Sequence, residues 1–389
     1  MSEQMSTVML SHQRRIELLR ALAAAGVPEI QTSAFGRGHD LAEMREEVEA
    51  AKSVNPDCEL VYGGVNRAED VQLAADAGYD SVQIWTGVFL GGATPAYAGA
   101  VYHRAWQGRD WRDLSFPSGT ADQVDRTRRI ADEGARRGVK VAGGLMLLSY
   151  ADDDYVAQYC AGAAEAGVYE VMMGDHSSGM TPDAYARLVR VAKDAAPGLG
   201  ISVHPHDMFG LANACGLAAA QAGADVVEVS VNGFTEGPAQ ADLAQVATAL
   251  EALYGVGTGV SLAAMTPLAR LTERLLGQTR PGDWGLTGET VFNYGEGGDG
   301  SGELKIDRLI HNSITPEVVG NEGQLVIAVS SGPFTMWDKL AELGIAAARN
   351  EIMPVLDACK TAMKALERGL SDAEISEIAQ RVLAGCRSA

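Results

Sequence analysis

The sequence predicts a (β/α)8 TIM barrel followed by a smaller, mostly helical C-terminal subdomain. From residue 11 to about 252, short apolar, β-branched runs alternate evenly with amphipathic, Ala-rich stretches. Near-continuous apolar strands that alternate with helices indicate a parallel sheet buried on both faces. Polar residues also gather where the predicted strands end, which is where barrel enzymes place their active sites. A doubly wound open sheet is the competing topology, and the evenness of the repeat favours the barrel.

Each strand is predicted from an apolar run, and each helix from the amphipathic stretch beside it. Ala-Gly junctions such as Ala77-Gly78 are typical of helix C-caps that turn directly into the next strand. Seven strands are found and the pattern opens on a helix, so we expect one further barrel strand before residue 1. The strands are expected at 28–35, 58–65, 79–85, 139–148, 168–175, 200–206 and 225–232. The helices are expected at 11–25, 40–53, 67–77, 120–137, 152–166, 181–195, 210–222 and 239–253.

The regular alternation of strand and helix patterns ends after residue 260, and this change gives the predicted domain boundaries. Residues 277–303 are rich in Gly, Thr and acidic residues, which indicates irregular structure, and helical patterns resume near residue 334. We therefore expect a barrel domain over 1–262, an irregular segment over 263–310 and a helical subdomain over 311–389.

Charge and composition exclude some classes of function. The 389 residues carry 51 acidic and 31 basic side chains, a formal net charge of −20, whereas nucleic-acid binding needs clustered Lys and Arg. No apolar run reaches the roughly 18 residues that span a bilayer, and the N-terminus does not resemble a signal peptide. The five cysteines contain no CxxC pair. We expect a cytoplasmic protein with reduced cysteines that binds neither nucleic acid nor a membrane.

The strongest local signal for chemistry is the segment Val203-His204-Pro205-His206-Asp207. Side chains at i and i+2 of a strand point to the same face, so both histidines would project into the mouth of a barrel. Two imidazoles in this arrangement are typical of a divalent-metal site, which needs at least one further ligand. The alternative is that the two histidines make ordinary hydrogen bonds within the protein or lie close together by chance. We predict that His204 and His206 bind a metal.

Other polar residues follow the neighbouring strands. Asp175 and His176 end the preceding strand, where we expect a substrate-binding or supporting carboxylate and a substrate-binding or third metal-binding nitrogen. An N-cap or a loop ion pair is the alternative for Asp175. Glu236 and Gln240 follow the last strand, and either is expected to supply an oxygen ligand or to orient one. An ordinary loop role is the alternative for both.

One long loop, 86–119, interleaves aromatic residues with arginines. Loops of this length in compact domains are often lids or binding loops. We expect His103, Arg109 and Arg112 to contact an anionic substrate or a nucleotide-like group. A structural loop or a dimer contact is the alternative.

Residues 203–243 resemble the signature segment of the DRE-TIM metallolyases, which include homocitrate synthase, isopropylmalate synthase and hydroxymethylglutaryl-CoA lyase. The family pattern is HxHND-x-G-x-A-x-AN and, after an apolar helix and strand, N-G-x-G-E-R-x-G-N. Weaker matches run from Glu3-Gln4, at the family's N-terminal RDGEQ/REGEQ signature, to 314–320, which resembles the PExVG of the synthase tail. The matching positions of the signature segment are His204, His206, Gly210, Ala212, Asn232, Gly233 and Glu236.

The resemblance implies a metal-assisted Claisen or aldol reaction in a homodimer. The metal, a divalent Mg, Mn, Co or Zn ion, would bind His204, His206 and Gln240 and polarise a 2-oxo acid substrate. The synthase-like tail favours condensation of that acid with an acyl-CoA. The residues that would serve catalysis are Glu3, Gln4, Gln31, Asp175 and Glu236.

Several departures from the family pattern leave other functions open. The family's first strand carries a metal-binding Asp and a catalytic Arg just before the point at which this sequence begins. Gln31 stands where the family has Glu, and Tyr294-Gly295-Glu296-Gly297-Gly298-Asp299 replaces the HESGxH segment of the synthases. A CoA-independent aldolase or lyase is the first alternative that these changes suggest, and a non-catalytic partner subunit is the second.

Overall fold

The chain folds into two compact units, Met1–Thr279 and Arg280–Ala389. The structure is a computed structural model. It describes residues 9–33, 40–65, 67–85, 120–235, 237–295 and 304–388.

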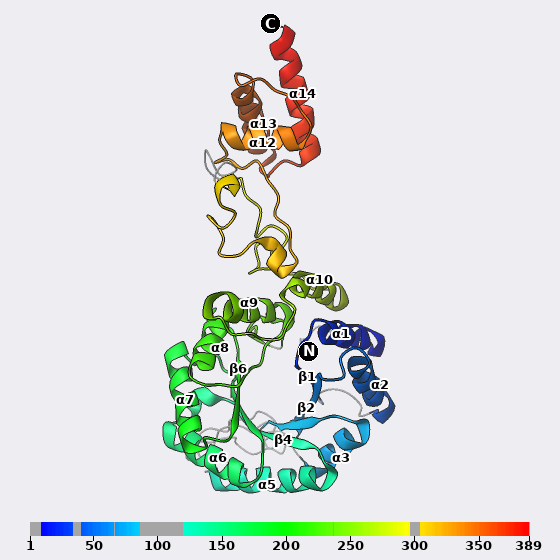
Figure 1. The fold of residues 1–389 in the computed structure, drawn as a ribbon, viewed down its shortest axis with the longest axis vertical. Helices are drawn as coiled ribbons and strands as arrows, with labels where there is room; N and C mark the ends of the chain where they lie inside the picture. Colours follow the sequence, from blue (N-terminus) through cyan, green and yellow to red (C-terminus); the bar gives the residue numbers. More distant parts are fainter. Residues whose placement is uncertain are drawn as a thin grey trace, which may run out of the picture. The chain divides into compact units, whose positions relative to one another are not determined.

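The first unit is built around a seven-stranded parallel sheet in the order β1-β2-β3-β4-β5-β6-β7. Because every strand pairs with the next one along the chain, each βα repeat extends the same edge of the sheet. The sheet curls into a half-barrel with its helices on the outside, a TIM-barrel-like fold (Figure 1). The prediction of seven parallel strands is confirmed. The strands are β1 (Glu29–Ser33), β2 (Glu59–Val65), β3 (Ser81–Ile84), β4 (Lys140–Leu145), β5 (Glu170–Asp175), β6 (Gly200–Pro205) and β7 (Val226–Val227).

The helices of the first unit begin and end at residues that suit those positions. Asp40, Asp152 and Asp242 accept hydrogen bonds from backbone N–H groups in the first turns of α2, α6 and α9. Gly78 and Gly255 end α3 and α9 in the left-handed conformation. The eight predicted helices are all found close to their expected positions. The helices are α1 (His12–Ala24), α2 (Leu41–Lys52), α3 (Ala68–Ala77), α5 (Thr120–Arg137), α6 (Asp153–Glu165), α7 (Pro182–Ala195), α8 (Ala212–Gln221), α9 (Leu243–Tyr254) and α10 (Met265–Leu276).

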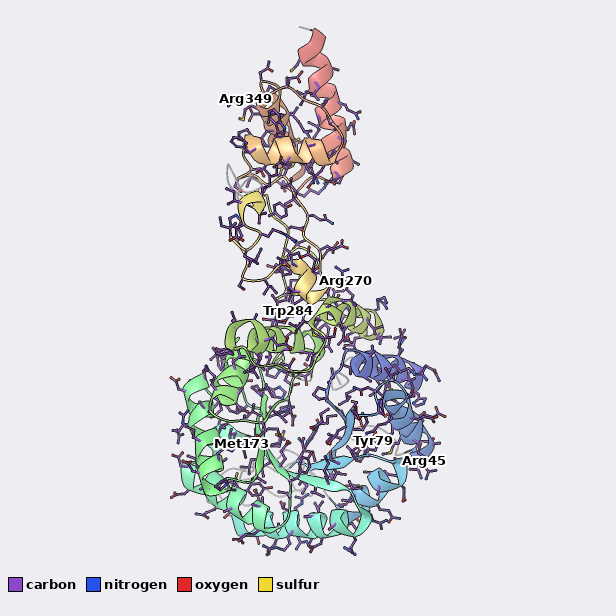
Figure 2. All side chains as sticks on the ribbon, viewed as in Figure 1. Arg45, Tyr79, Met173, Arg270, Trp284 and Arg349 are labelled. Atoms are coloured by element: carbon purple, nitrogen blue, oxygen red, sulfur yellow. The ribbon has the colours of Figure 1, made fainter. Side chains whose placement is uncertain are left out.

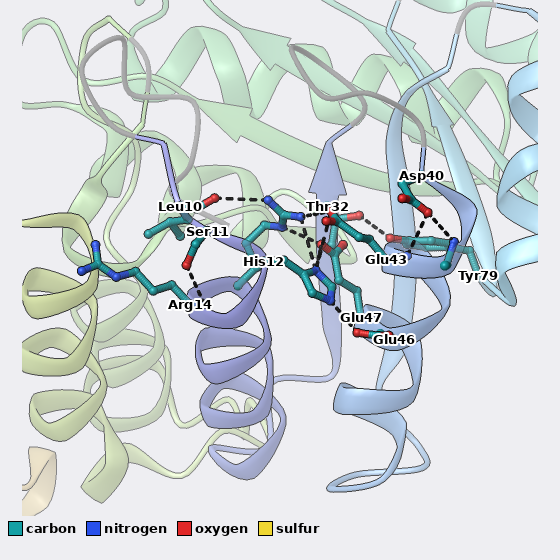
Figure 3. Close-up of polar contacts among 12 residues, drawn as sticks. Leu10, Ser11, His12, Arg14, Thr32, Asp40, Glu43, Glu46, Glu47 and Tyr79 are labelled. Carbon is teal, nitrogen blue, oxygen red and sulfur yellow. Dashed lines mark hydrogen bonds and ion pairs between the residues drawn. The ribbon is translucent and has the colours of Figure 1, made fainter.

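A buried ion pair joins α1 to α2 (Figure 3). Arg15 donates through Nε to Glu47 (2.6 Å) and through Nη2 to Glu43 (2.7 Å). Its third donor, Nη1, reaches the carbonyl of Leu10 at 3.2 Å. Arg15 and Glu47 are both buried, so the charge of each needs a nearby opposite charge, and Glu43 shares the compensation of Arg15 with Glu47.

Close packing fixes the strands against one another. A Cβ on Gly144 would lie 2.1 Å from the carbonyl oxygen of Ile84, so β3 and β4 approach at a distance that only glycine allows. The hydroxyl of Tyr79, two residues before β3, lies 2.8 Å from Thr32 Oγ1 on β1. Figure 2 shows Tyr79 and, on β5, Met173 inside the ring of helices.

The second unit has a core of its own, formed by three helices: α12 (Pro333–Glu342), α13 (Ile352–Leu366) and α14 (Asp372–Ser388). Met336 and Val355 are fully buried in this core. Lys339 is buried as well, and its ammonium pairs with Asp372 at the start of α14 (2.6 Å). No helix among the described residues of either unit is long and apolar enough to cross a membrane.

Candidate metal centre

His204 and His206 lie at the carboxyl end of β6, where strand alternation sends both side chains to one face. Their ring centroids are 5.0 Å apart, and their Nε2 atoms are 3.1 Å apart. His206 is buried, and 13% of the His204 side chain is exposed. The structure therefore brings the two predicted ligands together with the same ring nitrogen of each facing the other.

A backbone carbonyl fixes the hydrogen on His206. Its Nδ1 lies 3.1 Å from the Pro238 oxygen. A carbonyl oxygen only accepts, so Nδ1 carries the hydrogen and Nε2 of the neutral ring presents a bare lone pair. Burial, together with the nearby His204 and His176, lowers the pKa of His206 to about 3. His206 is thus a neutral imidazole, the form that binds metals.

Glu228 plays the corresponding part for His204. β6 and β7 pair with Val203 beside Val227, so Glu228 stands next to His204 in register. One of its carboxylate oxygens, Oε2, lies 2.6 Å from His204 Nδ1. Because a carboxylate accepts, His204 Nδ1 donates and its Nε2 is bare in the neutral ring. Two bare lone pairs 3.1 Å apart repel each other unless a cation or a proton lies between them.

The spacing of these nitrogens fits two ligands of one divalent metal. Two imidazole nitrogens that each lie 2.0–2.1 Å from a metal ion are about 2.9 to 3.4 Å apart, and the observed separation is 3.1 Å. Within the parts of the chain that the structure describes, no three His, Cys, Asp or Glu side chains form a metal site. The histidine pair alone would therefore be an incomplete ligand set.

Gln240 reaches the histidines from the segment that follows the last strand. It forms an antiparallel bridge with His206, and Asp207 N donates to the Ala239 carbonyl at 2.5 Å. The amide nitrogen of Gln240 lies 3.1 Å from His204 Nδ1. Turning the terminal amide over exchanges its oxygen and nitrogen without moving the rest of the side chain. The amide thus lies beside the His204 ring, 3.1 Å from Nδ1 and 3.5 Å from Nε2, and its nitrogen also faces the Glu228 carbonyl oxygen at 3.4 Å.

The two predicted residues at the end of β5 differ in their contacts. His176 Nδ1 lies 3.2 Å from His206 Nε2, with the two rings edge to face. Asp175 is buried, and its two oxygens accept from Ser177 Oγ (3.0 Å) and from Met180 N (2.7 Å). His176 thus adjoins the centre, whereas Asp175 holds the turn after β5.

Gln31 is connected to the centre through other side chains. It donates from Nε2 to Gln83 Oε1 (2.7 Å), and Gln83 donates from Nε2 to Glu228 Oε1 (2.6 Å). The predicted residues that lie outside the described residues are Glu3, Gln4, His103, Arg109, Arg112 and Glu236.

Sequence reasoning missed Gln83 and Glu228. Each is a polar residue inside an apolar strand run, Ser-Val-Gln-Ile-Trp and Val-Val-Glu-Val. A polar side chain in such a run needs a hydrogen-bond partner, because burying it without one costs free energy. That signal indicates a buried polar contact on the sheet, although it does not identify the partner.

The chain has relatives among proteins named synthases. Residues 112–272 match the HMGL-like family. The chain is 29% identical over 346 residues to a probable 2-isopropylmalate synthase of Methanopyrus kandleri, and the match covers 88% of this chain and 64% of that protein. It is also 29% identical over 357 residues to the 2-phosphonomethylmalate synthase of Streptomyces rubellomurinus, covering 90% of this chain and 88% of that protein. The chain thus spans less than two thirds of the length of the first relative.

Among solved structures, the hydroxymethylglutaryl-CoA lyase of Pseudomonas aeruginosa superposes with a TM-score of 0.57 at 20% sequence identity. The superposition covers 72% of this chain and 90% of the lyase. At this level of identity the likeness concerns the fold, and it agrees with the TIM-barrel-like arrangement of the first unit.

Proposed function

We propose that this chain, which carries an HMGL-like domain of the DRE-TIM type, is a divalent-metal-dependent synthase that joins an acyl-CoA to a 2-oxo acid. The observation that carries the proposal is the pair of bare Nε2 atoms of His204 and His206, 3.1 Å apart. Each ring has its Nδ1 hydrogen committed to a separate acceptor. This arrangement directs one nitrogen lone pair of each ring toward the same point, as two ligands of one metal would.

In the proposed centre, some residues would bind the metal and others would orient the metal ligands or contact the substrate. His204 and His206 would hold the metal through Nε2, with the Gln240 amide oxygen as a third ligand. When bound, a divalent metal supplies a Lewis acid that polarises the carbonyl of the 2-oxo acid. Glu228 orients His204 by accepting from its Nδ1 (2.6 Å). His176 adjoins the same face through its contact with His206 and would donate a hydrogen bond to the substrate.

Condensation is favoured over cleavage by the extent of the synthase relatives. The matches to the two synthases run over 346 and 357 residues. Both are longer than the first unit, which ends at Thr279. Both matches therefore include part of the second unit. The corresponding sequence in the relatives belongs to proteins that are named synthases.

The finer predictions on fold and assembly belong to the same proposal. β1 and β7 are the two edges of the described sheet, and an eighth strand between them would complete a (β/α)8 barrel. A closed barrel needs no free sheet edge, which removes a template for unwanted strand pairing. A cytoplasmic homodimer that uses Mg, Mn, Co or Zn remains the expected form of the enzyme.

A thiol-release assay tests the proposed activity. The purified chain is mixed with acyl-CoA donors and 2-oxo acids in the presence of Mg²⁺, Mn²⁺ or Co²⁺, and free CoA is measured with a thiol reagent. We expect metal-dependent CoA release from at least one pair of substrates and its loss in His206→Ala. His311→Ala, an exposed histidine of the second unit, serves as the matched control and should keep the rate. Absence of CoA release with every pair, or release that ignores a chelator, would contradict the proposal.

A further inference from the structure

A relay of side chains runs from β3 to the end of β7 and ends on His204. Trp85 donates from Nε1 to Gln83 Oε1 at 2.6 Å, and Gln83 donates from Nε2 to Glu228 Oε1 at 2.6 Å. Glu228 Oε2 lies 2.6 Å from His204 Nδ1. Trp85 and Gln83 are 8% and 1% exposed. Hydrogen bonds in such water-poor surroundings are stronger than at the surface, and their partners are costly to leave unpaired.

The chemistry of the first residue sets the direction of the whole relay. An indole N–H is a donor and never an acceptor, so the amide atom of Gln83 that faces Trp85 is the oxygen. The other amide atom of Gln83, which faces Glu228, is therefore the nitrogen and donates. Glu228 receives that hydrogen bond as a carboxylate on Oε1 and offers Oε2 as an acceptor to His204. The relay thus favours a hydrogen on Nδ1 of His204, and the Gln240 amide, which lies 3.1 Å from that atom, then has to present its oxygen to it.

Gly63 on β2 leaves the space in which side chains from β1 and β3 contact each other. Gln31 on β1 reaches Gln83 on β3 past β2, at the level of Gly63. A Cβ on Gly63 would lie 2.9 Å from Gln31 Cδ and 3.1 Å from Trp85 Cζ2. Any larger residue would displace both neighbours of Gln83. The donation from Gln31 to Gln83 Oε1 (2.7 Å) also holds the amide in the orientation that Trp85 imposes.

We propose that Trp85, Gln83 and Glu228 act together as positioning residues that fix His204 in the tautomer with hydrogen on Nδ1 and a bare Nε2. This tautomer is a property of the metal-free chain. Its consequence for metal affinity rests on the proposed function. The relay has the role that carboxylate partners of metal-binding histidines have in general, since they orient the ring and raise its basicity.

The tautomer is measured directly by nuclear magnetic resonance on the full chain. The protein is labelled with ¹⁵N at histidine, stripped of metal, and studied at about pH 8.5, where an ordinary imidazole is neutral. The chain has only seven histidines, so the His204 signals are assigned by their loss in His204→Gln. We expect a protonated Nδ1 and a bare Nε2 in the wild type. A His204 ring with its hydrogen on Nε2 would overturn the proposal.

Two variants break the relay at different points. Glu228→Gln keeps the shape of the side chain, but its single oxygen cannot accept from both Gln83 and His204. Trp85→Phe keeps most of the packing and removes the donor that sets the direction. We expect that His204 no longer holds its hydrogen uniformly on Nδ1 in Glu228→Gln. In Trp85→Phe we expect a mixture of the two His204 tautomers. Gln245→Met, which removes the partner of Asn213 outside the relay, is the control and should leave the His204 signals unchanged.

Co²⁺ affinity, followed by visible absorption, supplies the second readout. We expect Glu228→Gln to weaken Co²⁺ binding by roughly 10- to 100-fold, the usual effect of losing such a partner. Retention of both the tautomer and the affinity in Glu228→Gln would refute the relay. If the wild type has the expected tautomer, Glu228→Gln loses it, and neither binds Co²⁺, the relay stands and the proposed function fails.

Discussion

Replacing Glu170 with Gln should change the pH dependence of stability in a direction that the structure specifies. Glu170, the first residue of β5, is 4% exposed and accepts from Ser202 Oγ at 2.7 Å. Burial raises its pKa from 4.5 to about 7, and repulsion from Glu228 and Asp225 adds to the rise, against a lowering by the Ser202 hydrogen bond. Glu170 therefore stays protonated in the folded chain at pH values where the unfolded chain has lost the proton.

The sign and size of the effect follow from linkage. Below pH 4.5 the carboxyl is protonated in both states, so it does not affect the free energy of unfolding. Between pH 4.5 and about 7 only the unfolded chain ionises, and the free energy of unfolding falls as the pH rises. At 1.36 kcal/mol per pH unit the total loss is about 3 kcal/mol. Glu170→Gln cannot ionise and should escape this loss.

Urea unfolding at about pH 4.5, 6 and 8 tests this prediction. The stability of Glu170→Gln relative to the wild type should rise by about 3 kcal/mol across this range. If the glutamine amide fits the site less well than the carboxyl, that cost is the same at every pH. It cancels because the test compares how the stability difference between variant and wild type changes with pH. Glu17→Gln, at an exposed position of α1, controls for the loss of one negative charge and should give a flat difference. A flat difference for Glu170→Gln as well would refute the reasoning.

Three further substitutions test the packing within each of the two units. Glu47→Gln should lower the free energy of unfolding by about 1 to 3 kcal/mol, because the buried Arg15 loses one of its two carboxylate partners and keeps Glu43; an unchanged free energy of unfolding in urea would contradict this. Gly144→Ala should cost about 1 to 3 kcal/mol by forcing β3 and β4 apart, and an unchanged midpoint in thermal unfolding would count against that close approach. Met336→Ala should cost about 2 to 5 kcal/mol in the second unit, and hydrogen exchange should show the loss of protection in α12 and α13.

The strands and helices of the first unit were predictable because their signals are local. Apolar runs and amphipathic stretches depend on side-chain periods of 2 and 3.6, which each segment carries by itself. The last strand was wrong in length, since the run expected over 225–232 ends as β7 at Val227. Asn232 and Gly233 both have positive φ in the short 3-10 helix that replaces the end of this strand. Asn and Gly tolerate that conformation, so Asn-Gly was a turn signal inside an apolar run.

The candidate centre was predictable only in part, for a related reason. His204 and His206 share a face because they are two residues apart on one strand, which the sequence alone shows. The contact between Gln83 and Glu228 depends on the curl of the sheet, which brings β3 opposite the end of β7. Nothing local to either segment encodes that distance. The same holds for Gln240, whose approach to His204 depends on the bridge between its backbone and His206.

Equilibrium binding of Co²⁺ to the metal-stripped chain tests the central claim, that His204 and His206 form a divalent-metal centre. The account predicts one Co²⁺ per chain, with an absorption spectrum that reports nitrogen ligands. It also predicts a loss of affinity of at least about tenfold in His204→Ala and in His206→Ala. His311→Ala should bind as the wild type does. A wild-type chain that binds no Co²⁺, or either alanine variant that binds it unchanged, would contradict the claim.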